Sequence, residues 1–181
     1  EDIARGVLFL IADAADPTEF ECGVDEYGPR RDVMPMGIQP PPSTSNQLTD
    51  CVEVAIDIDF HTYGTFGNDC YPAVEWALAI LAGVNTIYTE SVDALINVQA
   101  SYIHVWETTD PYAAYTGNAG AMLDAFRLEW LQNPDLADRP RDLVHLLTRR
   151  SDTGTGGIAY LGVNCSASYA AGFSSYLSPS M

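Results

Sequence analysis

The residues from Val52 to His61 alternate between apolar and polar side chains, and this alternation constrains the fold more than any other feature of the chain. The apolar residues that share one face of the predicted strand are Val52, Val54, Ile56, Ile58 and Phe60. The polar residues on the other face are Glu53, Asp57, Asp59 and His61. Because side chains of a strand point alternately to its two faces, this period of two predicts a β-strand.

A predicted helix follows this strand. Asp69 is placed to cap its first turn, which carries Pro72, and apolar residues recur at helical spacing as far as Tyr88. A second strand is predicted over Asn97 to Trp106. A helix of this length between two strands provides a right-handed crossover, so the two strands are expected to be parallel.

The same alternation of helix and strand repeats further along the chain. Asn118 is placed to cap a second helix, which Asn133-Pro134 ends. The apolar residues that share one face of this helix are Met122, Phe126 and Trp130. Leu143 to Thr148 is predicted as a third strand. The sequence therefore predicts an α/β fold with a mainly parallel twisted sheet and crossover helices.

A fourth strand is predicted over Ile158 to Val163, directly after the turn Gly154 to Gly157. This turn is too short for a crossover, so we expect the fourth strand to run antiparallel to its neighbour and to form an edge of the sheet. The Ser-, Tyr- and Gly-rich stretch Ser166 to Met181 is compatible with one more short strand.

The first 50 residues differ in character from the rest. We expect residues 1–33 to form an appendage with one buried strand, Gly6 to Ala12, and residues 34–50 to be a Pro- and Ser-rich linker. The compact domain is then residues 51–181. Residue 1 is Glu and no basic-then-apolar leader precedes it, so we expect a processed or trimmed chain.

The charge of the chain excludes several classes of partner. Its 25 acidic and 8 basic residues, all Arg, give a formal net charge of −17. Such a surface repels nucleic acid and anionic lipid, and no apolar run reaches the roughly 20 residues that span a bilayer. The absence of Lys, four dispersed cysteines without C-x-x-C spacing and a glycosylation sequon at Asn164 favour secretion into an extracellular, oxidising setting.

Four ordered segments resemble the reprolysin (adamalysin-like, M12B-type) branch of the metzincin zinc metallopeptidases. They are 52–57 (VEVAID), 105–112 (VWETTDPY), 141–148 (RDLVHLLT) and 157–165 (GIAYLGVNC). The resemblance covers about residues 51–170 and implies the upper subdomain of such an enzyme, with a remnant of its pro-region in residues 1–33.

Enzymes of that family hydrolyse peptide bonds with a zinc ion held on an H-E-x-x-H-x-x-G-x-x-H segment. This chain does not contain that segment, and its three histidines are His61, His104 and His145, none four residues from another. We therefore expect the chain to end before the zinc helix, to bind no zinc and to be inactive by itself. His145 stands in an apolar run and is expected to be a core histidine bonded to the backbone.

The resemblance also implies a calcium site at Glu53 and Asp142, away from the zinc. Carboxylate oxygens suit calcium, but two carboxylates fall short of its six to eight ligands. The alternative is that each acid is solvated at the end of a strand. A carboxylate pair at Asp57 and Asp59 shares one face of the first strand, but no nearby motif supports glycosidase chemistry.

The four cysteines are assigned differently. Cys22, in Phe20-Glu21-Cys22-Gly23-Val24, resembles the cysteine switch that keeps metzincins latent, with a disulfide as the alternative. By resemblance, Cys165 pairs with a partner beyond residue 181, which leaves Cys51 and Cys70 as a candidate pair. A strand of about nine residues at about 3.3 Å each would separate those two by roughly 30 Å, which argues against their pairing.

Two functional hypotheses follow. In the first, the chain is part of a secreted zinc endopeptidase, and the edge strand pairs with an extended peptide substrate. In the second, it is an extracellular structural subunit that assembles into oligomers or filaments by strand exchange between Gly6 to Ala12 and the open edge of a neighbouring copy. The edge residues are Ile158, Ala159, Tyr160, Leu161, Gly162 and Val163.

Overall fold

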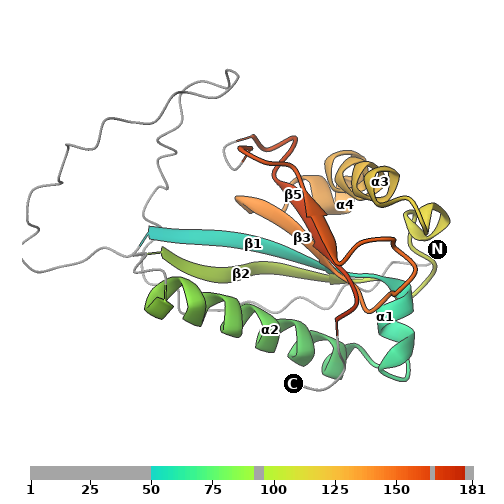
Figure 1. Ribbon diagram of the computed structural model, residues 1–181, viewed down its shortest axis with the longest axis horizontal. Coiled ribbons are helices and arrows are strands. Elements are labelled where there is room, and N and C mark those ends of the chain that lie inside the picture. Colours follow the sequence, from blue (N-terminus) through green and yellow to red (C-terminus); the bar gives the residue numbers. More distant parts are fainter. Residues whose placement is uncertain (1–49, 92–95, 164–165, 178–181) are drawn as a thin grey trace, which may run out of the picture.

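The computed structural model describes residues 50–91, 96–163 and 166–177. It contains one five-stranded sheet with helices on both faces (Figure 1). The predicted strand Gly6 to Ala12 and the linker lie outside the described residues. The predicted α/β class and the mainly parallel sheet are confirmed.

The sheet has the order β2-β1-β3-β5-β4. Its strands are β1 (Asp50–Ile58), β2 (Ile96–Val105), β3 (Leu143–Leu147), β4 (Gly157–Ala159) and β5 (Ala171–Ser174). All neighbouring pairs are parallel except β4 with β5, which is antiparallel. The expected antiparallel edge strand is therefore confirmed, although its neighbour is β5 and not the preceding strand β3.

β5 lies between β3 and β4, and its backbone pairs with both strands. Gly172 makes this packing tight: a Cβ at that position would lie 2.8 Å from the Cβ of Ala159. A Cβ at Gly157 would lie 2.8 Å from the carbonyl oxygen of Phe173. The two glycines thus allow β4 to lie directly against β5.

The helices begin and end close to where their capping residues predict. They are α1 (Phe60–Thr65), α2 (Cys70–Thr86), α3 (Ala119–Gln132) and α4 (Pro134–Ala137), with a π turn η1 (Ile87–Ser91) and a 3-10 turn η2 (Ala113–Tyr115). The predicted caps are confirmed: Asp69 accepts from the Tyr71 N–H, and Asn118 accepts from the Ala121 N–H. Phe60 was expected to continue β1, but Asp59 ends that strand by capping α1.

Helices α2 and α3 cover opposite faces of the sheet (Figure 1). Val54, Ile56 and Ile58 of β1 pack in one core cluster with Ala73, Val74, Trp76 and Ala77 of α2. Ala55 belongs to the second cluster, whose α3 members are Met122, Leu123, Phe126 and Trp130. Both faces of β1 are therefore buried, as expected for a strand inside a mainly parallel sheet.

Helix α2 leaves part of its side of the sheet uncovered. A groove of about 340 Å³ lies between α2 and strands β1 to β3. Its lining is almost entirely apolar and comprises Val52, Val54, Ile56, Ile80, Leu81, Val84, Tyr88, Ile96, Val98, Leu143, His145 and Leu147. By length and composition alone, the described stretch Cys70–Thr89 could cross a membrane. Since its inner residues pack against the sheet, we interpret it as a core helix.

The carboxylate of Asp57 is fully buried beneath α3, on the face of β1 opposite α2. His104 Nδ1 lies 2.9 Å from its Oδ1. Its Oδ2 accepts from the indole N–H groups of Trp106 (3.2 Å) and Trp130 (3.0 Å) and from the Tyr112 hydroxyl. Burial, followed by the negative charge of Asp57, raises the pKa of Tyr112 well above its usual value, so the hydroxyl keeps the proton that it donates.

Replacement of this carboxylate is expected to destabilise the whole domain. In Asp57→Asn, an NH2 group takes the place of one carboxylate oxygen. This group donates and cannot accept a hydrogen bond, so at least one of the donors around residue 57 loses its acceptor. We expect a loss of about 3 kcal/mol or more in the free energy of unfolding, because each buried donor left without an acceptor costs about 1–3 kcal/mol. Urea denaturation measures this loss. The control Asp152→Asn, at an exposed carboxylate, should stay within about 0.5 kcal/mol of the parent chain.

Candidate functional site

The outer edge of β4 is the most exposed part of the sheet and the candidate functional site. All three residues of the strand are exposed. The Ser175 N–H donates to the Gly156 carbonyl, and the Tyr160 N–H donates to the Ala171 carbonyl. Backbone groups of an antiparallel strand alternate between its two sides, so the intervening Gly157 and Ala159 direct their N–H and C=O groups away from β5. Among the described residues, the N–H and C=O of Ala159 are available to a further strand.

The two outward-facing residues differ in how they are occupied. The Thr155 hydroxyl donates to the Gly157 carbonyl at 3.1 Å, and its oxygen lies 3.5 Å from the Gly157 nitrogen. The structure gives Ala159 no such side-chain partner among the described residues. Ala159 therefore presents the main-chain donor and acceptor that a docking strand would meet first.

The edge strand is shorter than the sequence predicts. Only Ile158 and Ala159 of the predicted strand Ile158 to Val163 are in β4, which begins one residue earlier at Gly157. Tyr160 turns toward α3, where its hydroxyl donates to Asp124. Gly162 has a φ of 72°, which is incompatible with a continuing strand. Asn164 lies outside the described residues, so its role as a glycosylation site stays a prediction.

Apolar side chains flank the exposed edge. Leu161 is 92% exposed, and Ile158 and Tyr169 are also exposed. Leu161 and Ile158 lie on the edge strand or directly after it, within reach of any chain that pairs with Ala159. The edge thus combines free main-chain groups with apolar surface, which are the two features that strand addition uses.

Glu53 and Asp142 are brought together by hydrogen bonds. The Glu53 N–H donates to the Asp142 carboxylate at 2.7 Å, and the Asp142 N–H donates to the Glu53 carbonyl at 2.9 Å. The Asp142 carboxylate therefore fastens the start of β3 to β1. Among the described residues no group of three or more His, Cys, Asp or Glu could hold a metal ion, so the calcium site stays a prediction.

Cys51 and Cys70 are not paired with each other in the structure, where both are free thiols. Cys51 lies near the start of β1 and Cys70 at the start of α2, so the strand separates them. The Cys70 thiol donates to Glu107 at 3.3 Å. Burial, with that hydrogen bond, raises the pKa of Cys70 to about 11, which keeps it a protonated, poorly reactive thiol. Cys22 and Cys165 lie outside the described residues.

The three histidines do not form a zinc site. His61 is exposed in α1, whereas His104 is bonded to Asp57 and His145 Nε2 lies 3.0 Å from the Ser174 hydroxyl. Burial lowers the pKa of His145 to about 4, so it is neutral at physiological pH. The expected core histidine is therefore bonded to a side-chain hydroxyl and not to the backbone.

Sequence reasoning missed that both acids of the first strand are buried. The Asp59 carboxylate accepts from the Thr62 N–H (2.9 Å), the Thr148 hydroxyl (2.7 Å) and Arg150 Nε (3.1 Å). With Asp57 bonded as described, neither carboxylate is free for acid–base chemistry. The predicted fold could have indicated this burial. Helices cover both faces of a parallel sheet, so polar residues on either face of its central strand are buried and need hydrogen-bond partners within the protein.

Asp110 is a third buried acid near this cluster, and it is less well satisfied. Its Oδ2 accepts from the Phe60 N–H at 3.2 Å, while its buried Oδ1 has no partner among the described residues. Burial, and then the charge of Asp59, raise the pKa of Asp110 above its usual value. The cluster fixes the connection between β1 and α1.

Comparisons with known proteins agree with this architecture. A model of metallo-peptidase family M12, of the reprolysin type, matches residues 49–179. The chain is 28% identical over 126 residues to human disintegrin and metalloproteinase domain-containing protein 9, a match that covers 68% of this chain. It spans only about 14% of the length of that curated relative.

A solved structure shows a related fold. A chain from a structure of a chaperone–substrate complex superimposes with a TM-score of 0.53 at 12% sequence identity. The match covers 70% of the present chain and 21% of the other. At this level of identity the likeness concerns the fold alone.

The pairing of His104 with Asp57 predicts a pH dependence of stability. Burial lowers the pKa of His104, but its hydrogen bond to Asp57 and the charges of Asp57 and Glu129 raise it by more, so the net pKa lies above the usual value. Protonated His104 is therefore more stable in the folded than in the unfolded state. Its contribution to stability is fully present below the unfolded pKa of 6.5 and is lost as the pH rises through the folded-state pKa.

We therefore expect the free energy of unfolding to decrease over that interval in the parent chain and to lack this component in His104→Asn. Denaturant titrations at several pH values measure the difference between the two proteins. A difference that does not change with pH would contradict the assignment.

Proposed function

The chain belongs to metallo-peptidase family M12, and from that premise we propose that residues 50–177 form the sheet that binds extended peptides in a reprolysin-type zinc endopeptidase. The observation that carries this proposal is the open edge of β4, where the N–H and C=O of Ala159 have no partner among the described residues. An extended substrate would pair with these groups and lengthen the sheet by one strand.

The flanking side chains support an extended peptide as the ligand. Main-chain pairing is indifferent to sequence, so selectivity must come from side chains beside the strand. Ile158 and Leu161 offer apolar surface there, in a chain whose formal charge is otherwise strongly negative. Apolar side chains at alternate positions of the peptide fit this edge better than acidic ones, which the net charge repels.

The residues that the structure describes do not fit a zinc ion, so we assign them no hydrolytic step. His104 and His145 are bonded inside the domain, and His61 lies on a separate helix. On the proposed function, zinc ligands come from polypeptide outside the described residues. The uncovered apolar groove beside α2 also supports the presence of further polypeptide. Its volume is about 340 Å³ and its lining is almost entirely apolar, so it suits coverage by protein.

We also propose that the protein is secreted and acts outside the cell. The sequon at Asn164 and the four dispersed cysteines support this location. The Cys22 thiol would serve there as a latency switch on the zinc of the complete enzyme.

The coding sequence tests the enzymatic proposal directly. We expect the gene to encode H-E-x-x-H-x-x-G-x-x-H within roughly one hundred codons after Met181, because two His one helical turn apart and a third after a Gly turn are what the family's zinc requires. Sequencing the gene beyond this point is the measurement. If the intact gene lacks the segment, the proposal that the chain is part of a zinc endopeptidase fails, while the assignment of the fold is unaffected.

Loss of one backbone N–H should abolish strand addition at β4. Proline has no N–H and is tolerated at sheet edges, so Ala159→Pro removes the outward donor with little change in the fold. The probe is a synthetic eight-residue peptide of alternating valine and threonine, titrated against the ¹⁵N-labelled chain by NMR. We expect shifts at Gly157 and Ala159 in the parent chain and in the control Ala159→Ser, and none at Gly157 in Ala159→Pro.

The same open edge favours a second candidate function. A structural subunit could place its own segment Gly6 to Ala12 on the β4 edge of a neighbouring copy and so assemble into filaments. Light scattering of the same three proteins distinguishes this possibility. Assembly that disappears in Ala159→Pro supports the structural role, whereas a strictly monomeric parent chain that binds the peptide supports the first proposal alone.

A further inference from the structure

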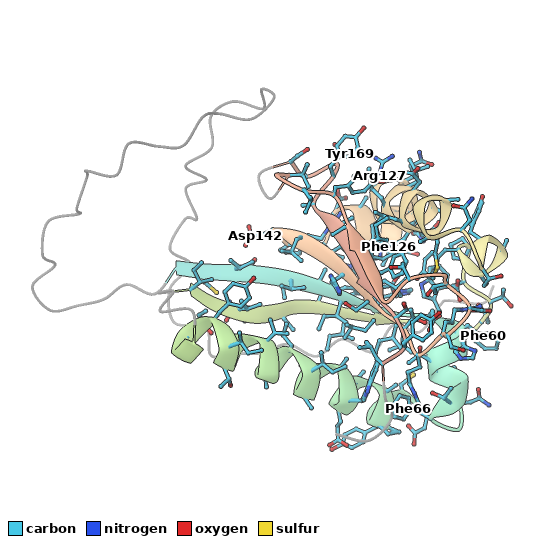
Figure 2. All side chains as sticks on the ribbon, viewed as in Figure 1. Phe60, Phe66, Phe126, Arg127, Asp142 and Tyr169 are labelled. Atoms are coloured by element: carbon cyan, nitrogen blue, oxygen red, sulfur yellow. The ribbon has the colours of Figure 1, made fainter. Side chains whose placement is uncertain are left out.

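A single arginine of α3 lies between two tyrosines that flank the edge strand. The guanidinium carbon of Arg127 lies 4.6 Å from the ring centroid of Tyr169 and 5.9 Å from that of Tyr160. The two rings meet edge to face, with centroids 5.3 Å apart and planes at 87°. Figure 2 shows Arg127 and Tyr169 together at the end of the molecule where α3 approaches the loops beside β5.

Hydrogen bonds and charge hold this group in place. The Arg127 Nη1 donates to the Ser168 carbonyl at 3.2 Å, and the Tyr160 hydroxyl donates to Asp124. Asp124 also pairs with Arg127, at 3.9 Å between Oδ1 and Nε. The Arg127 side chain is only 16% exposed, so its attraction to the aromatic rings is little weakened by water.

The positions of these partners in the chain define what Arg127 holds. Tyr160 directly follows β4, and Ser168 and Tyr169 come just before β5. Arg127 therefore contacts both ends of the connection between the two strands and ties them to α3. We call Arg127, Asp124, Tyr160, Ser168 and Tyr169 the arginine clamp.

The edge strand needs such support because its own pairing is weak. β4 has three residues, which is at the lower limit for a strand, and it pairs with β5 alone. Its last ladder contact, from the Tyr160 N–H to the Ala171 carbonyl, is long at 3.4 Å. Without a further attachment, the end of β4 that carries Ala159 would open readily from the sheet.

We propose that Arg127 is the positioning residue of the β4 edge: by joining Tyr160 and Tyr169 to α3, it holds the outward N–H and C=O of Ala159 in the plane of the sheet, where a peptide strand can pair with them. This inference rests on the proposed function for the use of the edge by a peptide. The clamp itself acts on β4 whether or not a peptide binds. Arg127 does not touch the peptide.

Hydrogen exchange tests the clamp without any ligand. In Arg127→Met, which keeps an unbranched apolar stem and removes the guanidinium group, we expect roughly ten-fold faster exchange of the Ile158 and Tyr160 amides, because local opening exposes these groups. The Leu146 amide, in β3, should be unchanged. Arg127→Lys keeps a cation over the rings and should restore part of the protection.

Two further variants separate this role from general destabilisation. Tyr169→Leu removes the ring nearest the guanidinium at a surface position, and it should accelerate the same two amides while the domain stays folded. Arg139→Met is the matched control: Arg139 lies 4.7 Å from the Tyr102 ring, far from β4 in the sheet order, and its loss should leave Ile158 unchanged.

Equal exchange at Ile158 in Arg127→Met and Arg139→Met would overturn the inference. The valine–threonine peptide then separates the two proposals. If the parent chain binds the peptide and Arg127→Met binds it several-fold more weakly at unchanged urea stability, both stand. If Arg127→Met binds as the parent does, the positioning role fails and the proposed function remains. If Ile158 exchanges faster but the parent chain binds no peptide, the clamp stands and peptide binding fails.

Discussion

The buried carboxylate of Asp57 is the constraint on which the rest of the structure depends. Moving an ionised carboxylate out of water costs several kcal/mol unless the protein supplies donors in good geometry. Here the donors come from β2, from the connection that follows it and from α3. The domain can therefore satisfy Asp57 only when β1, β2 and α3 are all in place. Asp59 lies two residues further along the chain. Its carboxylate is satisfied only when α1, the residue after β3 and Arg150 are in place.

These two acids also bring together three of the four segments that resemble the family. The first segment ends at Asp57, the second supplies its donors Trp106 and Tyr112, and the third supplies Thr148 for Asp59. The segments are distant in the sequence and meet at one place in the fold. Three of the four segments therefore contribute to the contacts of these two acids, and only the fourth segment, around β4, lies at the candidate peptide edge.

Much of the fold followed from spacing. The alternation in 52–58, the caps at Asp69 and Asn118 and the short turn before β4 predicted the strands, helices and edge that the structure contains. The insertion of β5 could not be predicted, because it depends on Gly172 allowing close backbone approach to Ala159, its partner 13 positions back in the chain. Phe60 continued the apolar alternation, yet the capping side chain of Asp59 outweighed it. The arginine clamp could not be predicted for a similar reason. The contacts of Arg127 with Tyr160 and Tyr169 join residues that are distant in the sequence, so nothing in the helix itself distinguishes Arg127 from other charged residues.

The position of β5 between β3 and β4 has a consequence for how the protein is made. On a ribosome, β4 leaves the exit tunnel before β5, yet among the described strands it pairs only with β5. The edge therefore cannot join the sheet until residues 171–174 have been synthesised. During that interval, the nascent sheet ends at β3, and β4 stays unpaired. The order of translation thus makes the β4 edge the last part of the described sheet to form, and the edge of β3 stays open until then.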